Sequence, residues 1–487
     1  MCGIAVIEGK YLPGEMHKML LSIKHRGPDD TGSYIKDNIA LGQVRLSIID
    51  VKGGHQPIFN EDRTKCIVFN GEIYNYKELK EKLKQKHVFS TKTDTEVILH
   101  LYEEEGPECI KKLDGMFAFA ICDNGKLFIG RDRIGIKPLY FGVKEDTMYF
   151  ASEIKALLEC ERVSVFLPGY YYVSGGDFIK YYELPGKVSI SADIKVITAM
   201  VECLLEKAVQ KRLMSDVPVG VFLSGGVDSS IIAAIMKKNI MDLNSFTVGM
   251  KDSDDLFYSQ KVAEYLRTKH HEFVYTKKDL LEALPDVIYH LESFDAPLVR
   301  SALPSYFLSK LAGEKVKVVL AGEGADELFS GYKYLGKINE KKDLYKELYK
   351  ITGNLHFTNL QRVDRMTMAH SVEGRVPFLD SEFLSYIISI PAELKQKKDR
   401  QEKWILREAF NEYLPIIIVN RPKQKFSAGA GSMEILKEYA EEKITDSDFK
   451  KEKNNRVRTK EELLYYRLFR ERFPYSVVQC SGKTEVF

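Results

Sequence analysis

The sequence lacks an excess of charge of one sign, and it lacks a long apolar run. Its 72 lysine and arginine residues nearly balance 70 aspartate and glutamate residues. This balance gives no electrostatic reason to expect a nucleic-acid or membrane partner. No apolar stretch approaches the roughly 18 residues that a membrane-spanning helix needs. The N-terminus also lacks the pattern of a secretory signal.

The cysteines lack the spacing of a metal site. There are seven, an odd number, and none forms a CxxC pair. Most lie in apolar runs such as Phe117–Cys122, where a reduced thiol behaves as a small apolar group. They indicate neither a structural zinc site nor a disulfide framework, so we expect a reducing, cytoplasmic compartment. A length of 487 residues favours two large domains.

Residues 1 to about 185 contain short β-branched and aromatic runs separated by turns. Few helical stretches intervene, chiefly Tyr76–Gln85 and Thr95–Glu105. This pattern predicts an α+β domain of packed, mainly antiparallel sheets with flanking helices. The predicted strands are Gly3–Ile7, Ile39–Ile49, Cys66–Phe69, Met116–Cys122, Lys126–Ile129, Leu139–Val143, Met148–Ala151 and Tyr170–Val173.

The pattern changes after a break at Leu184–Lys187. A helix is predicted over Asp193–Leu213, and strands then alternate with helices, which predicts a doubly wound parallel α/β sheet. Beyond about residue 340 the pattern is mostly helical. We expect domains at 1–185 and 190–475 and a tail at 476–487. The predicted strands are Val217–Leu223, Ser245–Met250, His271–Tyr275 and Val316–Leu320, and the helices are Ser229–Lys238, Ser259–Arg267 and Leu280–Leu291.

Cysteine is the second residue of the chain. Removal of the initiator methionine would leave its thiol and a free α-amine on one residue. Because the thiol has a pKa of about 8.5 and the amine one of about 7.7–8.0, the neutral amine can take up the thiol proton. Cys2 is therefore a candidate nucleophile, and burial as a small apolar residue is the alternative for this residue taken alone.

The segment Val219–Ser230 has the pattern of a strand, a Gly-Gly turn and a helix start. Glycines let the backbone approach phosphate, and the first amides of the helix point at the anion. Asp228 in such a cradle implies a cation, and Mg²⁺ prefers hard oxygen ligands. The loop lacks the Gly-Lys-Ser/Thr ending of a kinase-type P-loop, so γ-phosphoryl transfer is not expected. A generic glycine turn is the alternative.

The run Ser224-Gly225-Gly226-Val227-Asp228-Ser229-Ser230 resembles the PP-loop of ATP pyrophosphatases, which cleave ATP between its α- and β-phosphates and adenylate a carboxylate or related oxygen. A second loop, Leu320–Phe329, fits the same chemistry. The resemblance implies that Asp326 joins Asp228 on Mg²⁺ and that Glu323 is a candidate proton acceptor near the acyl-adenylate. The implied ATP or pyrophosphate contacts are Phe222, Leu223, Ser224, Gly225, Gly226, Asp228, Ser229, Ser230, Val248, Ala321, Gly322 and Lys423.

Most of residues 1–155 resemble class II glutamine amidotransferase domains, which implies an αββα sandwich of the N-terminal-nucleophile hydrolase type. The matching motifs are Met1–Ile4, His25–Asp29, Arg45–Asp50, Phe69–Asn75, Thr93–Glu96, Gly115–Phe119 and Gly130–Tyr140.

The resemblance assigns the roles in amide hydrolysis. Cys2 would attack the side-chain amide of glutamine, giving a thioester and ammonia. The Asn70 side chain and the Gly71 N–H would stabilise the oxyanion. Arg45 suits the glutamine carboxylate, because a guanidinium pairs with it through two hydrogen bonds. The glutamine ammonium would meet Asp94, assisted by Glu72, whereas His25 and His55 are interpreted as structural.

Nearly the whole chain resembles the glutamine-hydrolysing asparagine synthetases, and the C-terminal motifs are Val363–His370, Glu373–Asp380, Lys403–Arg407 and Arg421–Lys423. The resemblance implies that ATP adenylates the β-carboxylate of aspartate and that ammonia then gives asparagine and AMP. A lysine at the position of Lys423 would contact the phosphates. A closed passage between the sites, keeping ammonia unprotonated, is a hypothesis.

The acceptor carboxylate is the point at which the sequence departs from the family. Arg300 resembles the arginine near the aspartate site, with Glu323 beside it, but Pro297 and Leu298 replace threonines of one branch. Ala321 stands where serine is frequent. A related amidotransferase acting on a peptide or cell-envelope carboxylate therefore stays an alternative. Phosphoribosyl or sugar-phosphate amidotransfer and a non-catalytic sensor are disfavoured by the PP-loop and by the intact candidate residues. The sequence leaves the oligomeric state open, with a homodimer among the options.

Overall fold

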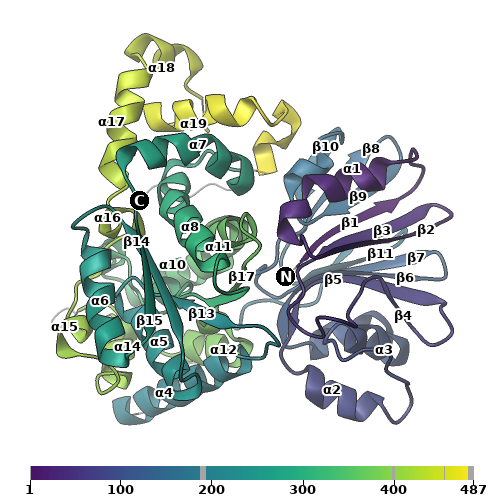
Figure 1. Cartoon of the computed structure of the whole chain (residues 1–487), viewed down its shortest axis with the longest axis horizontal. Helices are drawn as coiled ribbons and strands as arrows, with labels where there is room; N and C mark the ends of the chain where they lie inside the picture. Colours follow the sequence, from purple (N-terminus) through teal and green to yellow (C-terminus); the bar gives the residue numbers. More distant parts are fainter. Residues whose placement is uncertain (1, 187–192, 397–400, 455, 481–487) are drawn as a thin grey trace.

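The computed structural model describes residues 2–186, 193–396, 401–454 and 456–480. Two domains lie side by side, the N-terminal one in purple and blue and the C-terminal one in teal, green and yellow (Figure 1). The N-terminus of the chain lies where the two domains meet (Figure 1). This placement brings the candidate nucleophile at position 2 to the boundary between the domains.

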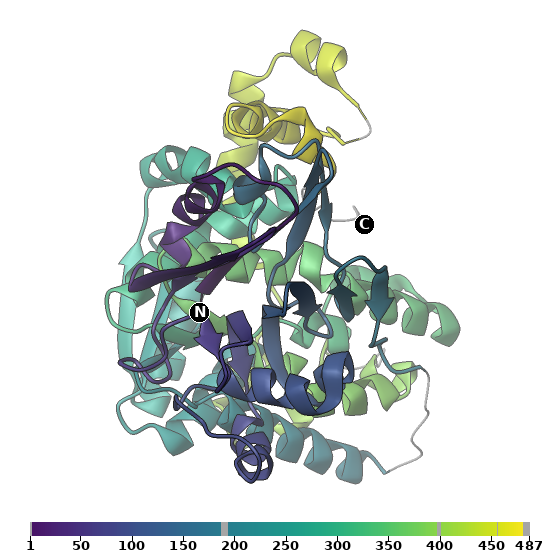
Figure 2. The ribbon, with the colours of Figure 1, turned by 90° about the vertical axis from the view of Figure 1, so that its right-hand side faces the viewer.

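The N-terminal domain contains two six-stranded antiparallel sheets, which Figure 2 turns toward the viewer. Their strand orders are β10-β8-β9-β1-β3-β2 and β12-β11-β7-β6-β5-β4. The strands are β1 (Cys2–Glu8), β2 (Asp30–Lys36), β3 (Ile39–Arg45), β4 (Ile58–Phe59), β5 (Lys65–Ile73), β6 (Gly115–Asp123), β7 (Lys126–Arg131), β8 (Tyr140–Lys144), β9 (Thr147–Ala151), β10 (Arg162–Val165), β11 (Tyr170–Val173) and β12 (Phe178–Lys180). The helices are α1 (Glu15–Ser22), α2 (Tyr76–Leu83) and α3 (Glu96–Glu105), with 3-10 turns η1 (Lys24–Arg26), η2 (Gly106–Lys112) and η3 (Ile154–Leu157).

The alternation of side chains along β1 shows how these layers stack. Ile4 belongs to an apolar cluster that includes Val68 of the second sheet. Ile7 belongs to another cluster, which includes Met16 of α1. Because odd and even side chains of a strand point to opposite faces, β1 is covered on both sides. Helix α3 packs through Leu99 in a cluster on the outer face of the second sheet. The layers are helix, sheet, sheet and helix, which confirms the predicted αββα sandwich.

The C-terminal domain is built on a five-stranded parallel sheet of order β15-β14-β13-β16-β17, as predicted for a doubly wound fold. From β13 the chain first adds β14 and β15 on one side and then β16 and β17 on the other. The switch point between β13 and β16 is where ligands bind in such sheets, at the carboxyl ends of the strands. The strands are β13 (Val219–Phe222), β14 (Asn244–Gly249), β15 (Lys269–Val274), β16 (Val318–Leu320) and β17 (Glu373–Arg375).

Helices cover both faces of this sheet. Leu320 belongs to the cluster that contains residues of α4 and α5, whereas Val319 belongs to the cluster that contains residues of α7 and α8. The helices are α4 (Ile194–Lys211), α5 (Val227–Asn239), α6 (Asp254–Leu266), α7 (Lys277–Leu291), α8 (Ala296–Gly313), α9 (Ala325–Leu328), α10 (Lys341–Gly353), α11 (Asn359–Met368), α12 (Ser381–Ser389), α13 (Ala392–Lys395), α14 (Trp404–Ala409), α15 (Ile416–Val419), α16 (Phe426–Gly429), α17 (Met433–Lys443), α18 (Asp446–Glu452) and α19 (Lys460–Arg470).

Helix α8 and strand β17 are among the elements that were not predicted from the sequence. Helix α8 is buried along most of its length and contains Pro304, so it shows neither an apolar stripe nor an uninterrupted helical pattern. Strand β17 consists of Glu373, Gly374 and Arg375, all buried, and it has no β-branched or aromatic residue. Its charged side chains pair with each other and with neighbours, and this compensation is visible only in three dimensions.

The C-terminal segment also differs from the expected tail. Residues 475–480 form η7 (Tyr475–Cys480), in which Val477 and Cys480 are buried. The Cys480 thiol lies 2.7 Å from the carbonyl oxygen of Val163 on β10. This segment therefore packs on the N-terminal domain. The rest of the predicted tail, 481–487, and residues 187–192 after the predicted domain break lie outside the described residues.

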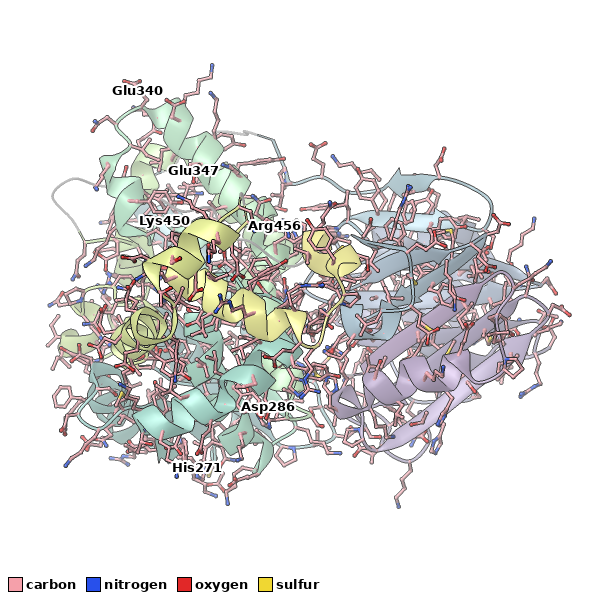
Figure 3. All side chains as sticks on the ribbon, turned by 90° about the horizontal axis from the view of Figure 1, so that it is seen from above. His271, Asp286, Glu340, Glu347, Lys450 and Arg456 are labelled. Carbon is pink, nitrogen blue, oxygen red and sulfur yellow. The ribbon has the colours of Figure 1, made fainter. Side chains whose placement is uncertain are left out.

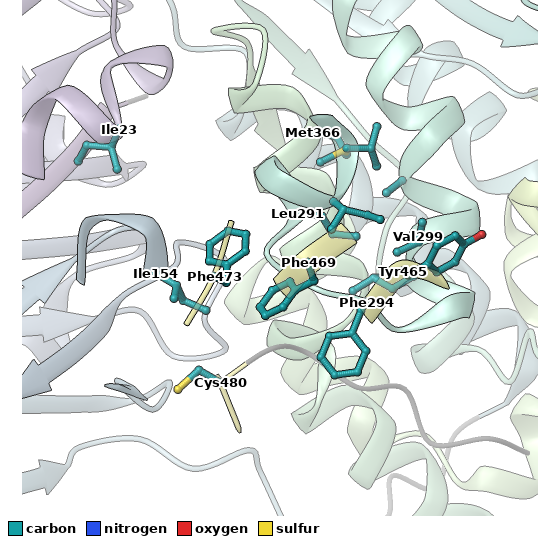
Figure 4. Packing of buried hydrophobic residues seen from close by; sticks show 14 of the residues in the cluster. Ile23, Ile154, Leu291, Phe294, Val299, Met366, Tyr465, Phe469, Phe473 and Cys480 are labelled. Carbon is teal, nitrogen blue, oxygen red and sulfur yellow. The ribbon is translucent and has the colours of Figure 1, made fainter. Parts of the chain in front are cut away.

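An apolar cluster and a polar seam join the two domains. Figure 4 shows Ile154 of the N-terminal domain beside Phe473 and Cys480 of the C-terminal segment. Next to this contact, the buried Arg26 guanidinium lies 2.6 Å from Glu153 and 2.8 Å from Asp364 of α11. Because a buried charge that loses its partner is costly, these ion pairs fix how the domains meet.

The surface carries charges of both signs. Figure 3 labels Glu340, Glu347, Lys450 and Arg456 on one face, where acidic and basic side chains are interspersed. Among the described residues, no helix is both long and apolar enough to cross a membrane.

Candidate active sites

The first candidate site lies at the start of β1. Cys2 is buried and pairs with Arg45 in the first sheet, and Asn70 lies on β5 of the second sheet. The Cys2 backbone N–H donates to Asn70 Oδ1 at 3.2 Å. Within the described part of the chain, Asn70 Nδ2 has no hydrogen-bond partner although it is buried. A buried donor of this kind costs free energy in the free protein and is ready to serve a ligand oxygen.

Gly71 follows Asn70 on β5, where its backbone fits closely against β6. A Cβ atom at this position would lie 2.1 Å from the Met116 carbonyl oxygen, so only glycine fits. The close fit fixes the position of the Gly71 N–H beside Asn70. The expected pair of oxyanion donors is therefore adjacent on one strand.

Burial raises the pKa of the Cys2 thiol, while the Leu46 backbone amide and the Arg45 guanidinium lower it. The thiol is consequently protonated in the free protein at neutral pH, and it needs a base when substrate binds. This agrees with the predicted need for the α-amine as proton acceptor.

Arg45, Glu72 and Asp94 are all buried in this region. The Arg45 guanidinium donates to the carbonyl oxygens of Ile49 and Asp50, at 3.2 and 2.8 Å, and these bonds hold it in place. Asp94 Oδ2 accepts a hydrogen bond from an adjacent backbone amide on β5 at 2.7 Å. The structure therefore brings the predicted glutamine-binding residues to one end of the two sheets.

The carboxyl groups of this site have raised pKa values. Burial raises the pKa of Asp94 to about 7, and burial together with Glu373 and Asp94 raises the pKa of Glu72 well above its ordinary value. These shifts show that burial and the neighbouring carboxylates outweigh the nearby Arg375 guanidinium, which lowers both pKa values. The ammonium group of an amino acid would add positive charge.

A residue of the other domain reaches this site. Arg375 on β17 lies 3.3 Å from Glu72 and 2.5 Å from Glu373. It also donates to the carbonyl oxygens of Arg212 and Met214, both in the C-terminal domain. Sequence reasoning did not assign Arg375 a role, because a charged three-residue strand resembles a solvated loop. It links the first site to the central sheet of the second domain.

The second candidate site lies at the switch point of the parallel sheet. The PP-loop follows β13, and Gly225 adopts a φ of 68°, which favours glycine. A Cβ atom on Gly225 would lie 2.4 Å from the backbone of Tyr258. Gly322, after β16, lies against the start of α5, since its Cβ would be 3.1 Å from Asp228. The two loops therefore meet, as the resemblance to the ATP pyrophosphatases implied.

The serines of the PP-loop hydrogen-bond within the loop. Ser229 Oγ accepts from the Ser224 backbone N–H at 3.2 Å. Ser230 Oγ is buried with no partner among the described residues. Phe222, Leu223, Val248 and Ala321 lie on or directly after β13, β14 and β16 around the loop, with Leu223, Val248 and Ala321 buried. The predicted ATP-contacting residues are thus grouped at one edge of the sheet.

A lysine bridges the two predicted metal ligands. Lys403 Nζ lies 2.5 Å from both Asp228 Oδ2 and Asp326 Oδ1. Lys423 Nζ lies 2.6 Å from Asp326 Oδ2. Although burial raises the pKa of Asp326, the two lysines hold it below its ordinary value. Sequence reasoning named the Lys403 segment as a family motif but gave Lys403 no role, and only its position before a buried tryptophan set it apart from surface lysines.

These residues fit a divalent cation. Asp228 Oδ1 is buried without a partner among the described residues, and the donors are hard carboxylate oxygens of the kind Mg²⁺ prefers. The Lys403 ammonium stands between the same two carboxylates, at a point where positive charge is needed. Asp228 and Asp326 are therefore suited to hold Mg²⁺ together with a polyphosphate.

Glu323 and Arg300 occupy different surroundings. Glu323 follows Gly322, and its Oε1 lies 2.5 Å from Arg362 of α11. The guanidinium of Arg300 on α8 instead pairs with Glu461 of α19, with Nε to Oε1 at 2.8 Å. The structure thus places Glu323 on the acidic loop with Asp326, whereas Arg300 is held by a C-terminal helix.

The comparisons with known proteins agree with this two-site arrangement. Residues 1–168 match the glutamine amidotransferase domain family, and residues 200–350 and 336–477 match the asparagine synthase family. Asparagine synthetase [glutamine-hydrolyzing] 2 of Arabidopsis thaliana is 40% identical over 99% of this chain and 89% of its own length. Asparagine synthetase B [glutamine-hydrolyzing] of Escherichia coli (strain K12) is also 40% identical, over 99% of this chain and 93% of its own length. The chain belongs to the glutamine-hydrolysing asparagine synthetase family.

Proposed function

We propose that this chain transfers the amide nitrogen of glutamine to the β-carboxylate of aspartate, with ATP converted to AMP and pyrophosphate. The observation that carries the proposal is the presence of both half-sites in one chain. A buried cysteine lies beside an unpartnered amide donor in one domain, and two carboxylates flank a PP-loop in the other. The relatives that align with nearly the whole chain are named glutamine-hydrolysing asparagine synthetases.

In the glutaminase half, some side chains would bind glutamine and others would take part in cleaving its amide. Arg45 would hold the glutamine carboxylate, and Asp94, with Glu72, its ammonium group. The α-amine of Cys2, freed by removal of Met1, would take the thiol proton as sulfur attacks the amide carbon. The Asn70 Nδ2 and Gly71 N–H would donate to the oxyanion of the tetrahedral intermediate, after which ammonia leaves and a thioester remains.

In the synthetase half, the PP-loop amides and Ser224, Ser229 and Ser230 would bind the phosphates of ATP. When bound, Mg²⁺ would neutralise phosphate charge between Asp228 and Asp326. Lys403 and Lys423 would exchange their carboxylate partners for phosphate oxygens as pyrophosphate leaves. Glu323 would accept a proton when ammonia attacks the acyl-adenylate, and Arg300 stays a predicted aspartate ligand.

Ammonia must cross from one domain to the other in neutral form. Ammonia has a basicity close to that of a lysine amine, so less than roughly 1% of it is unprotonated in neutral water. A passage closed to water would keep it nucleophilic. Two contacts between the domains support such a passage, because they hold the two half-sites close together. Arg26 pairs with Asp364, and Arg375 lies beside Glu72.

The remaining predictions concern the setting of the enzyme. We propose domain boundaries at 1–185 and 190–475, a cytoplasmic location and a homodimer. The family matches end at residue 168 and begin again at residue 200, which supports the first boundary. All seven cysteines are free thiols, in line with a reducing compartment.

The test is a panel of acids supplied with glutamine and ATP, with pyrophosphate release followed for each. We expect aspartate to support release of AMP and pyrophosphate and formation of asparagine. If another carboxylate, such as that of a peptide or a cell-envelope precursor, supports release and aspartate does not, the alternative acceptor is correct. If no acid does so, the proposed function is wrong.

The passage is tested separately with isotopes. Amide-labelled glutamine is supplied together with unlabelled ammonium in solution. We expect asparagine to carry the label with little dilution. Full mixing of the label with the ammonium in solution would rule out a closed passage, while leaving the two half-reactions intact.

A further inference from the structure

Four side chains converge on the outer helical layer of the N-terminal domain, away from the residues assigned above. One comes from the turn between β4 and β5, one from the loop after α2, and two from α3. Helices α2 and α3 lie near one another at the lower right of Figure 1, where they cover the second sheet. The four are Glu61, His87, His100 and Glu103, and one ligand atom of each lies within 4.8 Å of the others.

The separations between these atoms suit a single small cation. A zinc ion with bonds of about 2.0–2.2 Å to nitrogen and oxygen holds tetrahedral ligands about 3.3–3.6 Å apart. His87 Nδ1 lies 3.4 Å from Glu61 Oε1 and 3.6 Å from Glu103 Oε2. His100 Nδ1 lies 2.8 Å from Glu103 Oε2 and 3.8 Å from Glu61 Oε2. The observed separations bracket the value that a bound zinc ion requires.

The two imidazoles are oriented together. Their rings stack with centroids 4.5 Å apart and an interplanar angle of 28°. Both Nδ1 atoms therefore face the same carboxylate oxygen of Glu103. His100 is fully buried and His87 nearly so, which limits the freedom of both rings before a ligand binds.

The far nitrogens of both rings face carboxylates. His87 Nε2 lies 3.2 Å from Glu104 Oε1, within hydrogen-bond distance, whereas His100 Nε2 lies 3.6 Å from Glu96 Oε1 and has no hydrogen-bond partner among the described residues. Metal-binding histidines characteristically direct the nitrogen that does not bind the metal at a carboxylate, which fixes the tautomer and raises ligand basicity. His100 Nδ1 donates to Glu103 Oε2 at 2.8 Å in the free protein, so a cation would displace that proton and leave the remaining proton of the ring on Nε2.

The carboxylate ligands are also held in place. Glu103 Oε1 accepts a hydrogen bond from Asn60 Nδ2 at 2.7 Å, and its Oε2 faces the histidines. Glu61 Oε1 accepts from the Val88 backbone N–H at 2.9 Å. Two carboxylates and two neutral imidazoles carry a charge of −2, which a divalent ion would neutralise.

We propose that Glu61, His87, His100 and Glu103 form a binding site for a divalent transition-metal ion, with Zn²⁺ as the occupant. Nitrogen and oxygen donors in a four-ligand set suit zinc better than Mg²⁺, which prefers oxygen ligands and keeps several waters. Four protein ligands leave no open position, so the site is structural. It is separate in kind and place from the Mg²⁺ site of the synthetase domain.

A metal here would stabilise the scaffold of the glutaminase site. Helix α3 begins two residues after Asp94, and β5, which carries Asn70, starts just after the turn that carries Glu61. One ion bound by the β4–β5 turn, the loop after α2 and helix α3 would fix the position of β5, which carries Asn70, relative to the segment that carries Asp94. Binding to the folded state alone raises the unfolding temperature in proportion to the logarithm of free metal above its Kd.

The test measures metal binding to the full-length protein. After metal removal and titration with ZnCl₂, we expect about one tightly bound zinc per chain and a rise in unfolding temperature with free zinc. With Co²⁺ as the probe, we expect the visible bands of a tetrahedral ion without the near-ultraviolet band of a cobalt–thiolate bond. That band would assign the bound metal to a cysteine instead.

Two substitutions, with one control, identify the ligands. His87→Gln and Glu61→Gln should weaken zinc binding at least about tenfold and remove the stabilisation by zinc. His17→Gln, an exposed histidine on α1, is the matched control and should bind as the wild type does. Glu61 is the most exposed of the four, so its variant tests the site even if the histidine variant folds poorly. Equal zinc binding by wild type, His87→Gln and Glu61→Gln, or none by the wild type, would leave only an ion-pair network here.

Discussion

The two candidate active sites differ in how their polar groups are satisfied before substrate binds. In the glutaminase site, Asn70 Nδ2 and Glu72 Oε2 are buried without hydrogen-bond partners among the described residues. In the synthetase site, Lys403 and Lys423 lie against Asp228 and Asp326. In the glutaminase site, Arg375 offsets the buried carboxyls only in part, and their pKa values stay raised. In the synthetase site, lysines pair with both carboxylates, although Asp228 Oδ1 and Ser230 Oγ still lack partners among the described residues.

The difference follows from the substrates. Glutamine brings one positive and one negative charge, so a site with raised carboxyl pKa values and one fixed guanidinium is complementary as it stands. ATP with Mg²⁺ brings many charges of both signs. A site whose carboxylates are already paired with lysines avoids the cost of burying unpaired carboxylates. It must then exchange those ion pairs when ATP binds. We therefore expect the synthetase site to rearrange more on binding than the glutaminase site does.

The largest expected effect comes from Cys2→Ala. Because no other residue can form the thioester, glutamine-dependent synthesis should fall to background, whereas synthesis from added ammonium should continue. Asparagine formation from each nitrogen source is the measurement. Loss of both activities would mean that the two sites are not separable, and the comparison between them would fail.

Asp228→Asn is the reciprocal change. Loss of one carboxylate charge should abolish aspartate-dependent pyrophosphate release, because the metal and phosphate arrangement depends on that carboxylate. Glutamine hydrolysis should persist in the same preparation. A normal rate of pyrophosphate release would exclude the metal-binding role of Asp228.

Lys403→Met tests whether the bridging lysine serves ATP chemistry or only the free protein. If Lys403 moves to phosphate oxygens, its loss should slow pyrophosphate release about a hundredfold, the usual effect of losing one donor to developing charge. If it only keeps Asp228 and Asp326 apart in the free protein, the rate should change little and the stability should fall. Lys425→Met, which replaces an exposed lysine nearby, is the control.

Local patterns in the sequence predicted the sheet-rich first part, the alternating strands and helices of the second part, and the strand-turn-helix of the PP-loop. The residues around Cys2 and the role of the acidic loop were expected from the resemblance to known families. The Gly-Gly turn and the acidic loop each follow a predicted strand, but the strand order that makes β13 and β16 neighbours is known only from the structure. Glu373 and Arg375 were named only within a family motif. Their strand is short and charged, and burial of such residues depends on partners more than 150 residues away, such as Met214.

Lys403 shows the same limit at the active site. It pairs with a carboxylate 175 residues earlier in the chain. It also adopts a left-handed conformation with φ of 58°, which the neighbouring residues in the sequence do not predict. Helix α8 was missed for the opposite reason, since burial on most sides removes the apolar stripe that marks a surface helix. Local patterns predict elements and loops, but they do not predict ion-pair or packing partners that come together only in the tertiary fold.

Asn70→Ala should have a smaller effect than Cys2→Ala and should act on one half-site alone. Removal of one oxyanion donor raises the barrier by about 3 kcal/mol, so glutamine hydrolysis should fall roughly a hundredfold or more. Ammonia-dependent synthesis should be unchanged. If the rate of hydrolysis were to fall less than about tenfold, the open Nδ2 of Asn70 would not be an oxyanion donor.

The smallest expected effect is a pH dependence of glutamine binding. With its pKa raised by burial to about 7, Asp94 is mostly neutral below that pH and cannot attract an ammonium group. Bound glutamine favours the ionised carboxylate, so binding below pH 7 should release a proton, and the Kd should rise by up to about tenfold for each pH unit lost.

Calorimetry on the unreactive Cys2→Ala protein between about pH 6 and pH 8 isolates binding from chemistry. In that background, Asp94→Asn should bind more weakly at high pH and depend less on pH, because its amide does not titrate and only Glu72 remains to do so. A Kd that is flat for the parent while Asp94→Asn binds more weakly would show that Asp94 is already ionised in the free site. The glutaminase site would then be self-neutralised too, and the contrast between the two sites would disappear.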